Sequence, residues 1–149
     1  MSDARIKIIA SNRRARHDYD LTETMEAGLV LLGSEVKVLR DGKCTLSAAH
    51  VRVIAGEAWL VGATIPEYPF ANRFNHEPDR DRKLLLHKRQ VERLHRELRE
   101  RGTSCVVTRV YFKGARVKVE IAVARGKKLH DKRQALKSKQ AKREMRRNR

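Results

Sequence analysis

A short segment near the N-terminus contains side chains of the chemical types that contact nucleic acid. Its six candidate residues are Asn12, Arg13, Arg14, Arg16, His17 and Tyr19. The guanidinium groups suit phosphate oxygens, and the asparagine amide could read a base edge or a ribose 2′-hydroxyl. The histidine and the tyrosine could stack on an unpaired base or pack at the mouth of a barrel, and the sequence favours neither. The segment predicts a phosphate-contacting cluster, with an ordinary basic arm as the alternative.

The last 25 residues, 125–149, form the most basic part of the chain. They hold 12 Lys or Arg against two acids, a net +10 of the chain's +17. Such a segment cannot bury a core of its own, but it suits a polyanion because neutralised phosphates release counterions. As a helix it stacks like charges four residues apart, as at Lys128 and Lys132, and each such pair opposes the helix by about 0.2–0.5 kcal/mol. We expect this tail to be disordered when free and helical against RNA phosphates; a generic solvated tail is the alternative.

Neither the cysteines nor the titratable residues follow a catalytic or metal-binding pattern. The two cysteines and six histidines lack zinc-ligand spacing, and the sequence has no phosphate-binding glycine loop or nucleophile elbow. Asp79 and Asp81 are the nearest acidic pair, but their flanking arginines favour a turn over the metal site of a nuclease. We therefore expect no enzymatic activity, no metal and no cofactor.

The chain shows no pattern of a membrane protein or a secreted one. No apolar run approaches the roughly 20 residues of a membrane span, and the N-terminus has no apolar signal segment. The tail has too few apolar residues to lie on a membrane surface as a helix. We expect a cytoplasmic protein whose Cys44 and Cys105 are reduced and buried.

The elements that must position these groups are mostly short strands. The predicted strands are 18–32 with a bend at Gly28, two hairpin arms around the turn 55–57, and two more around the turn 113–115. Helices are predicted from an N-cap at Ser34 to Asp41 and over 87–101, with loops at 1–17 and 66–82. Trp59, at a strand position, is expected in the core.

Five or six antiparallel strands favour closure, because a barrel removes exposed sheet edges. The predicted fold class is mostly β (α+β), a small antiparallel oligonucleotide-binding-type barrel with flanking helices. A flat sheet with one helix packed on it is the alternative. Residues 1–124 would form this barrel with an N-terminal arm, and residues 125–149 the basic tail.

Five strings along the chain resemble one family closely. They are 12–19 (NRRARHDY), 26–29 (EAGL), 33–40 (GSEVKVLR), 82–86 (RKLLL) and 126–133 (GKKLHDKR). No single string is decisive, but their shared order and spacing resemble the small protein B (SmpB) family, the bacterial partner of transfer-messenger RNA.

The resemblance implies an RNA-binding cofactor of ribosome rescue rather than an enzyme. Members of the family bind the tRNA-like domain of transfer-messenger RNA and bring it to the A site of ribosomes stalled without a codon. Their tails enter the empty mRNA channel of the small (30S) subunit, near the decoding centre, and become helical there. We expect a monomer, with one copy per transfer-messenger RNA and no membrane or DNA partner.

The resemblance also assigns residues. Glu26, Lys83 and Leu85 join the N-terminal segment as contacts to transfer-messenger RNA. An acid on such a surface must accept from a base, a ribose hydroxyl or an arginine, and a structural ion pair is the alternative for Glu26. Leu85 belongs to a run of three leucines, at least one of which must face outward. The implied ribosome contacts are Lys127, Lys128, His130, Asp131, Lys132, Arg133 and Lys137, with the histidine stacking on an rRNA base.

Other RNA or DNA partners remain as alternatives. A general rRNA-binding or translation-factor-like protein with the same barrel needs only charge and aromatic residues, whereas this chain carries the five ordered strings. An architectural DNA-binding protein predicts apolar wedges and a dimer, and the sequence shows neither pattern.

Overall fold

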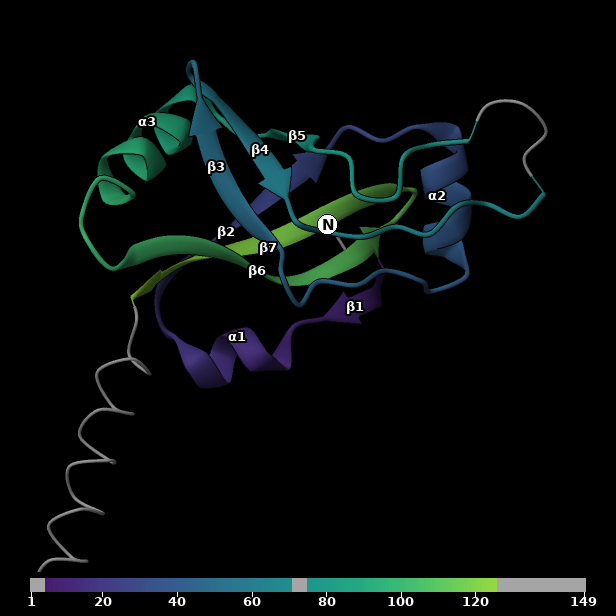
Figure 1. Cartoon of the computed structure of the whole chain (residues 1–149), viewed down its shortest axis with the longest axis horizontal. Helices are drawn as coiled ribbons and strands as arrows, with labels where there is room; N and C mark the ends of the chain where they lie inside the picture. Colours follow the sequence, from purple (N-terminus) through teal and green to yellow (C-terminus); the bar gives the residue numbers. More distant parts are fainter. Residues whose placement is uncertain (1–4, 71–74, 126–149) are drawn as a thin grey trace, which may run out of the picture.

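The computed structural model describes residues 5–70 and 75–125 (Figure 1). In this part of the chain the elements are β1 (Ile6–Ser11), α1 (Arg13–Asp18), β2 (Asp20–Leu29), α2 (Gly33–Arg40), β3 (His50–Ile54), β4 (Glu57–Val61), β5 (Arg82–Leu85), α3 (Lys88–Glu97), β6 (Thr103–Lys113) and β7 (Arg116–Arg125). The two hairpins, β3–β4 and β6–β7, are confirmed. The prediction of a loop over residues 1–17 is wrong, because β1 and α1 form there.

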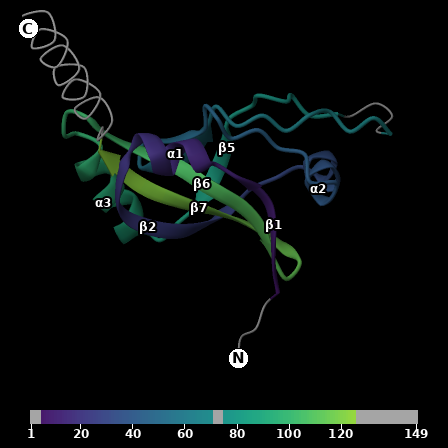
Figure 2. The ribbon, with the colours of Figure 1, turned by 90° about the horizontal axis from the view of Figure 1, so that it is seen from below.

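The strands form one antiparallel sheet that closes on itself. The strand order is β1-β6-β3-β4-β5-β2-β7, and β6 also pairs with β7. Six strands therefore make a ring, while β1 lies along β6 outside it (Figure 2). The ring supports the predicted closed sheet over the flat one, and its assignment to the oligonucleotide-binding type stays a prediction.

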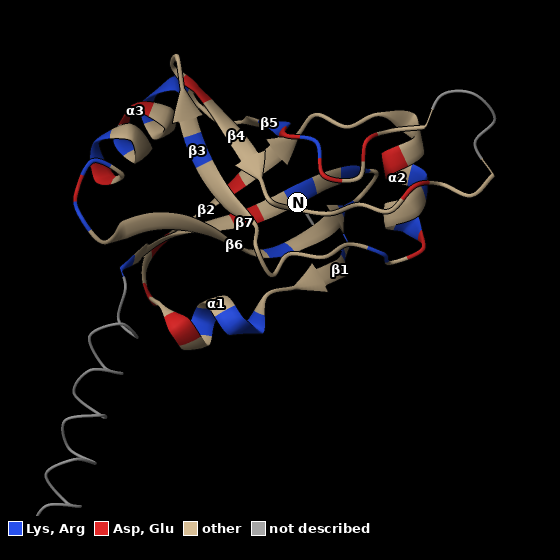
Figure 3. Cartoon of the chain, in the orientation of Figure 1, with Lys and Arg blue, Asp and Glu red and all other residues tan. Residues whose placement is uncertain are grey.

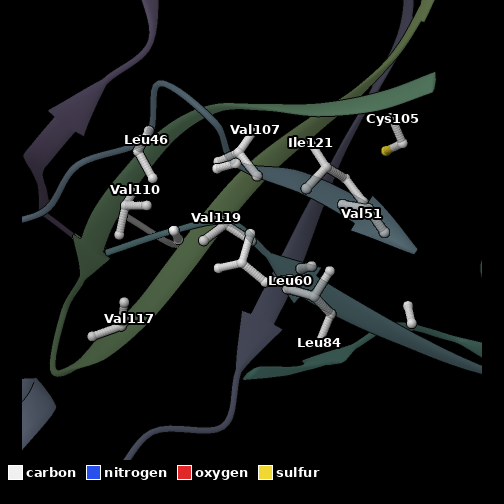
Figure 4. Close-up of a cluster of buried hydrophobic side chains, with 14 of the residues drawn as sticks. Leu46, Val51, Leu60, Leu84, Cys105, Val107, Val110, Val117, Val119 and Ile121 are labelled. Atoms are coloured by element: carbon white, nitrogen blue, oxygen red, sulfur yellow. The ribbon is translucent and has the colours of Figure 1, made fainter. Parts of the chain in front are cut away.

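The inside of the ring is the hydrophobic core. Alternate residues of β7, among them Val119, Ile121 and Val123, point into it, as the sequence pattern predicts. Figure 4 shows Val119 and Ile121 together with side chains from β3, β4, β5 and β6. α3 adds Val91 and Leu94 to the same core. Full burial of each large apolar side chain contributes about 1.5–3 kcal/mol.

A second apolar cluster lies on the outside of the ring. Ala15 of α1 packs there against Val106, Ala122 and Ala124. Both faces of the end of β7 are consequently buried, whereas the alternation predicted only one. A helix of six residues is not stable alone, so α1 depends on this contact with the sheet.

The segment around α2 departs from the prediction at its start. The strand predicted to run to Leu32 ends at Leu29, and Val30 and Leu32 are exposed rather than buried. The helix begins at Gly33, not after an N-cap at Ser34, because the Glu35 carboxylate accepts a hydrogen bond from the Leu32 N–H at 2.8 Å. Its predicted end at Asp41 is confirmed.

Three further expectations need correction. Trp59 lies on the outer face of the ring, partly exposed, because its neighbours Ala58 and Leu60 fill the core. The helix predicted over 87–101 is shorter, since α3 ends at Glu97. Gly28 does not bend its strand; the register of β2 against β7 shifts between Leu21 and Glu23 instead. Cys105 is buried as predicted, and Cys44 is only partly buried.

Candidate nucleic-acid interface

Three predicted contact residues far apart in sequence meet in one groove. Glu26, Lys83 and Leu85 line a groove of about 660 Å³, together with Lys88 and Lys118. They come together because Gly28 of β2 lies opposite Leu85 of β5 on one side and Lys118 of β7 on the other. Three lysines around an apolar side chain suit a phosphate backbone with a splayed base or ribose.

The leucine run presents one side chain outward, as expected. Leu84 is buried in the core, whereas Leu85 is 54% exposed in the groove. Gly28 makes room for it, because a Cβ at position 28 would lie 3.1 Å from the Leu85 Cβ. That separation is tighter than ordinary van der Waals contact, so any larger residue at position 28 would push Leu85 aside.

Glu26 is held by two partners from β6. The Tyr111 hydroxyl donates to its Oε2, and Lys113 Nζ lies 3.2 Å from its Oε1. The hydrogen bond from Tyr111 lowers the pKa of Glu26 most; burial opposes that effect, and Lys113 adds to it. Burial, together with the contact to Glu26, raises the pKa of Tyr111. The ion-pair alternative foresaw an arginine partner, but the partners are a tyrosine and a lysine.

A chain of polar contacts joins this groove to α1 across the outer face of β6 and β7. Glu120 Oε2 lies 3.5 Å from the Arg16 guanidinium and 3.5 Å from Arg109 Nε. It also accepts from the Thr108 hydroxyl. The Arg109 guanidinium lies 4.8 Å from the centre of the Tyr111 ring, which in turn contacts Glu26. The two predicted clusters therefore lie on one outer face of the ring, joined by a network in which Thr108 and Tyr111 are buried.

The arginines of the N-terminal segment lie on the exposed side of α1. Arg13, Arg14 and Arg16 are all exposed, and Figure 3 shows the positive charge on this helix. Arg13 and Arg16 line a hollow of about 250 Å³ with Arg109. Three guanidinium groups around one hollow suit a phosphate. Sequence reasoning missed Arg109, because only the pairing of β6 with β1 and β7 brings it to α1.

Asn12 differs from its prediction in what its amide does. It is 8% exposed. Its Nδ2 donates to the Leu46 carbonyl at 3.0 Å, and its Oδ1 accepts from the Ala15 N–H at 3.2 Å. Both ends of the amide are thus engaged within the protein. Asn12 caps α1 and positions the arginines, and its amide is not free to read a base edge.

His17 and Tyr19 take different roles. His17 is exposed and lies 3.4 Å from the Asp18 carboxylate, whereas Tyr19 packs partly buried against the cluster beneath α1. Tyr19 follows the packing alternative, and His17 keeps a face toward solvent. Trp59, which was expected in the core, lies on the outer face opposite Arg52 and Lys83 of the neighbouring strands. It adds an aromatic surface beside the groove.

The predicted ribosome contacts lie outside the described residues, as does the tail from residue 126 onward. The last described strand ends at Arg125, which pairs with Asp20 and Thr103. Arg125 also lies 3.6 Å from the Glu100 carboxylate. The last described residue, Arg125, therefore lies beside the starts of β2 and β6.

Within residues 5–70 and 75–125, no three His, Cys, Asp or Glu side chains come close enough to hold a metal ion. Burial raises the pKa of Cys44 to about 11 and that of Cys105 to about 12, so both are thiols at neutral pH. In the same part of the chain, no helix is long and apolar enough to cross a membrane.

A small closed sheet with a basic, partly aromatic outer face defines a nucleic-acid-binding barrel protein. The family model described as SmpB protein matches residues 9–149. The SsrA-binding protein of Syntrophotalea carbinolica is 55% identical over 140 residues, covering 94% of this chain and 93% of that relative. The one from Pelobacter propionicus is 53% identical over 139 residues, covering 93% and 91%.

A solved structure agrees with these matches. One chain of the structure described as "tmRNA-SmpB: a journey to the center of the bacterial ribosome" is 42% identical, with a TM-score of 0.66, and the match covers 79% of this chain and 83% of that one. The chain belongs to the SmpB family. This is a family of RNA-binding proteins that are not enzymes, so both the resemblance and the expectation of a non-enzymatic protein are confirmed.

Proposed function

We propose that this protein binds the tRNA-like domain of transfer-messenger RNA in the cytosol and delivers it to the A site of stalled bacterial ribosomes. The observation that carries the proposal is the outer face of the ring from α1 to the groove of Glu26, Lys83 and Leu85. Identity of 55% to a protein named SsrA-binding protein supports the same RNA, since SsrA is transfer-messenger RNA.

Each part of the surface has a distinct task in this proposal. Arg13, Arg14 and Arg16 neutralise phosphates, while Lys83 does so at the groove. Leu85 packs on a splayed base or ribose, and Glu26 accepts from a base amino group or a ribose hydroxyl. Because Tyr111 and Lys113 keep Glu26 ionised, the carboxylate is a pure acceptor there.

The tail carries the second half of the proposal. The tail from residue 126 onward enters the vacant mRNA channel of the 30S subunit and becomes helical against its phosphates, since Arg125, which the sequence assigns to the tail, is part of β7. The contacts are Lys127, Lys128, His130, Asp131, Lys132, Arg133 and Lys137, with His130 stacking on a base at the decoding centre. Messenger RNA already in the channel would compete for the same space, so the tail would distinguish empty A sites from occupied ones.

The first experiment is to recover the tagged full-length protein from its host in moderate salt and to sequence the RNA bound to it. A single dominant RNA with a tRNA-like acceptor end and an internal reading frame is the expected result, at one protein copy per RNA. A spread of rRNA and mRNA fragments would instead support the alternative, a general rRNA-binding or translation-factor-like barrel protein.

A further inference from the structure

The loop between β4 and β5 is held by its own side chains far more firmly than a connection requires. Its two described limbs are residues 62–70 and 75–81. The Asn75 side chain joins them, since its Oδ1 accepts from the Tyr68 N–H at 3.0 Å and its Nδ2 donates to the Tyr68 carbonyl at 2.8 Å. One side-chain amide thus satisfies both backbone hydrogen-bonding groups of Tyr68 and fixes the position of that residue.

A buried histidine fastens the loop to α2. His76 is 3% exposed. Its Nε2 lies 2.8 Å from the Ile65 carbonyl, and its Nδ1 lies 2.9 Å from the Ser34 hydroxyl on α2. A carbonyl only accepts, so Nε2 carries the proton. The ring therefore ties both limbs of the loop to the helix.

A buried ionic cluster makes a second attachment at the base of the loop. Glu35 of α2 is fully buried. Its carboxylate accepts hydrogen bonds from Arg82 Nε and from Arg80 Nη2, each at 2.6 Å. Burial opposes ionisation of Glu35, but the hydrogen bonds from Arg80, the Leu32 N–H and Arg82 outweigh it and lower the pKa. Buried ion pairs contribute little net stability, because desolvation offsets their attraction. What this cluster specifies is the position of the loop on α2.

The attachments hold an aromatic pair in which Tyr68 is partly buried and Phe70 is exposed. Phe70 is 80% exposed and packs edge-on against Tyr68, with ring centres 5.6 Å apart. Lys37 of α2 places its Nζ 5.4 Å from the centre of the Tyr68 ring. In Figures 1 and 2 the loop and α2 lie at the end of the molecule away from α1 and α3. A single exposed apolar residue is ordinary, but Phe70 lies on a loop whose position is fixed by the side chains of Asn75, His76 and Arg80.

Exposed residues of the segment after β2 lie between the groove and this aromatic pair. The pairing of β2 with β5 continues past Gly28 and Leu85, because the Val30 N–H donates to the Lys83 carbonyl at 3.0 Å. Val30 is exposed there, and so is Leu32 at the start of α2. Exposed apolar side chains thus lie between the groove and α2, the helix to which the loop is attached.

The described charges around the pair carry no net positive excess. Lys37, Arg40 and Lys43 are exposed there, and so are Asp41, Glu67, Glu77 and Asp79. These described side chains therefore do not favour phosphate neutralisation as the source of affinity at this end of the molecule. Aromatic stacking remains, and every nucleic-acid base offers a flat face for it.

We propose that Phe70, supported by Tyr68, is a stacking platform for one unpaired base of the tRNA-like RNA that covers the groove. The inference rests on the proposed function. It extends the contact surface from the groove to the loop beside α2, whose role the sequence alone does not reveal.

The test uses the full chain and a transcript of the tRNA-like domain, with binding measured at several salt concentrations. The variants are Phe70→Ala, Phe70→Leu and Phe70→Trp, and the matched control is Ile54→Ala, an apolar residue 49% exposed beside the β3–β4 turn. Alanine and leucine should each weaken binding roughly 5- to 150-fold, the range for loss of one base–aromatic stack. Tryptophan and the control should stay within about twofold of the parent, and the salt slope should not change.

The outcomes separate the possibilities. Full binding by Phe70→Leu would overturn the proposal, because any apolar contact would then serve. Full binding by Phe70→Ala alongside a parent that binds would overturn it and leave the proposed function standing. If a separate ribosome-binding assay showed that Phe70→Ala loses ribosome binding while it still binds the transcript, the assignment of Phe70 to this RNA would be overturned. A parent that does not bind the transcript would overturn the proposed function and this inference together. Thermal unfolding of each variant checks that the fold is intact.

Discussion

Replacing Tyr111 by phenylalanine removes one hydrogen bond, to Glu26, and leaves the ring in place. A hydrogen bond to a charged group contributes about 1.5–3 kcal/mol when buried. Here the Glu26 side chain is 37% exposed and keeps Lys113, so water and the lysine recover part of the loss. We expect Tyr111→Phe to lower the free energy of unfolding by about 1 kcal/mol at neutral pH.

The pH dependence makes this prediction specific. The folded-state pKa of Glu26 lies below its ordinary 4.5, chiefly through Tyr111. Its ionic contribution to stability is fully present above the unfolded pKa and is lost as pH falls through the folded pKa. Tyr111→Phe lacks the hydrogen bond that chiefly lowers the pKa of Glu26, so a smaller part of its stability depends on ionised Glu26. The difference between parent and variant should therefore shrink when the pH is lowered from neutral to a value below the folded-state pKa of Glu26, itself below 4.5.

The assay is urea unfolding of both proteins at the two pH values, with Tyr68→Phe as the matched control. The Tyr68 hydroxyl makes no hydrogen bond to any described residue, so the control should be close to neutral. A gap between parent and Tyr111→Phe that is the same at both pH values would refute the reasoning, because the hydroxyl would then not act on an ionised Glu26. A variant of full stability that binds the tRNA-like transcript as well as the parent would show that Glu26 needs no positioning.

Three further predictions concern the groove, the buried cluster and the tail. Gly28→Ala should weaken binding of the tRNA-like transcript several-fold in a filter or fluorescence assay, because the new Cβ displaces Leu85; Gly33→Ala, where a Cβ would meet no atom within 4 Å, is the control. Glu35→Gln leaves Arg82 buried without its counter-charge and should cost about 3–5 kcal/mol in urea unfolding; a loss below about 1 kcal/mol would mean that the arginines find other partners. Deleting 127–149 should leave transcript binding largely intact but abolish tagging of stalled chains in a reconstituted translation system; equal loss of both would make the tail a simple phosphate clamp.

The predictions that succeeded depend on strong local patterns. The β3–β4 and β6–β7 hairpins carry two-residue alternation on either side of a glycine turn, and the end of α2 carries Asp41 and Gly42. Each is decided by neighbours in the sequence, so the sequence alone is enough. The same holds for Leu85, because three consecutive apolar residues cannot all face one side of a strand.

The predictions that failed depend on distant partners. α1 is six residues long and has no readable period; it exists because Ala15 packs on Val106 and Ala122 from strands about a hundred residues later. The partners of Glu26, Tyr111 and Lys113, likewise come from β6. Trp59 was expected in the core, since nothing local shows that Ala58 and Leu60 already fill it. Such contacts require the strand order, which the sequence does not state.

The strand order also governs when the protein can fold. β7 pairs with β2 over nearly its whole length and with β6 as well, yet it is the last strand to be synthesised in the described part of the chain. The long loop that the β2–β7 pairing closes makes folding slow. A nascent chain that stops before Arg116 cannot complete the ring and leaves β2 without its main partner, as an open edge. Closure of the ring therefore waits for the synthesis of β7, and a chain interrupted before Arg116 lacks the strand that joins β2 to β6.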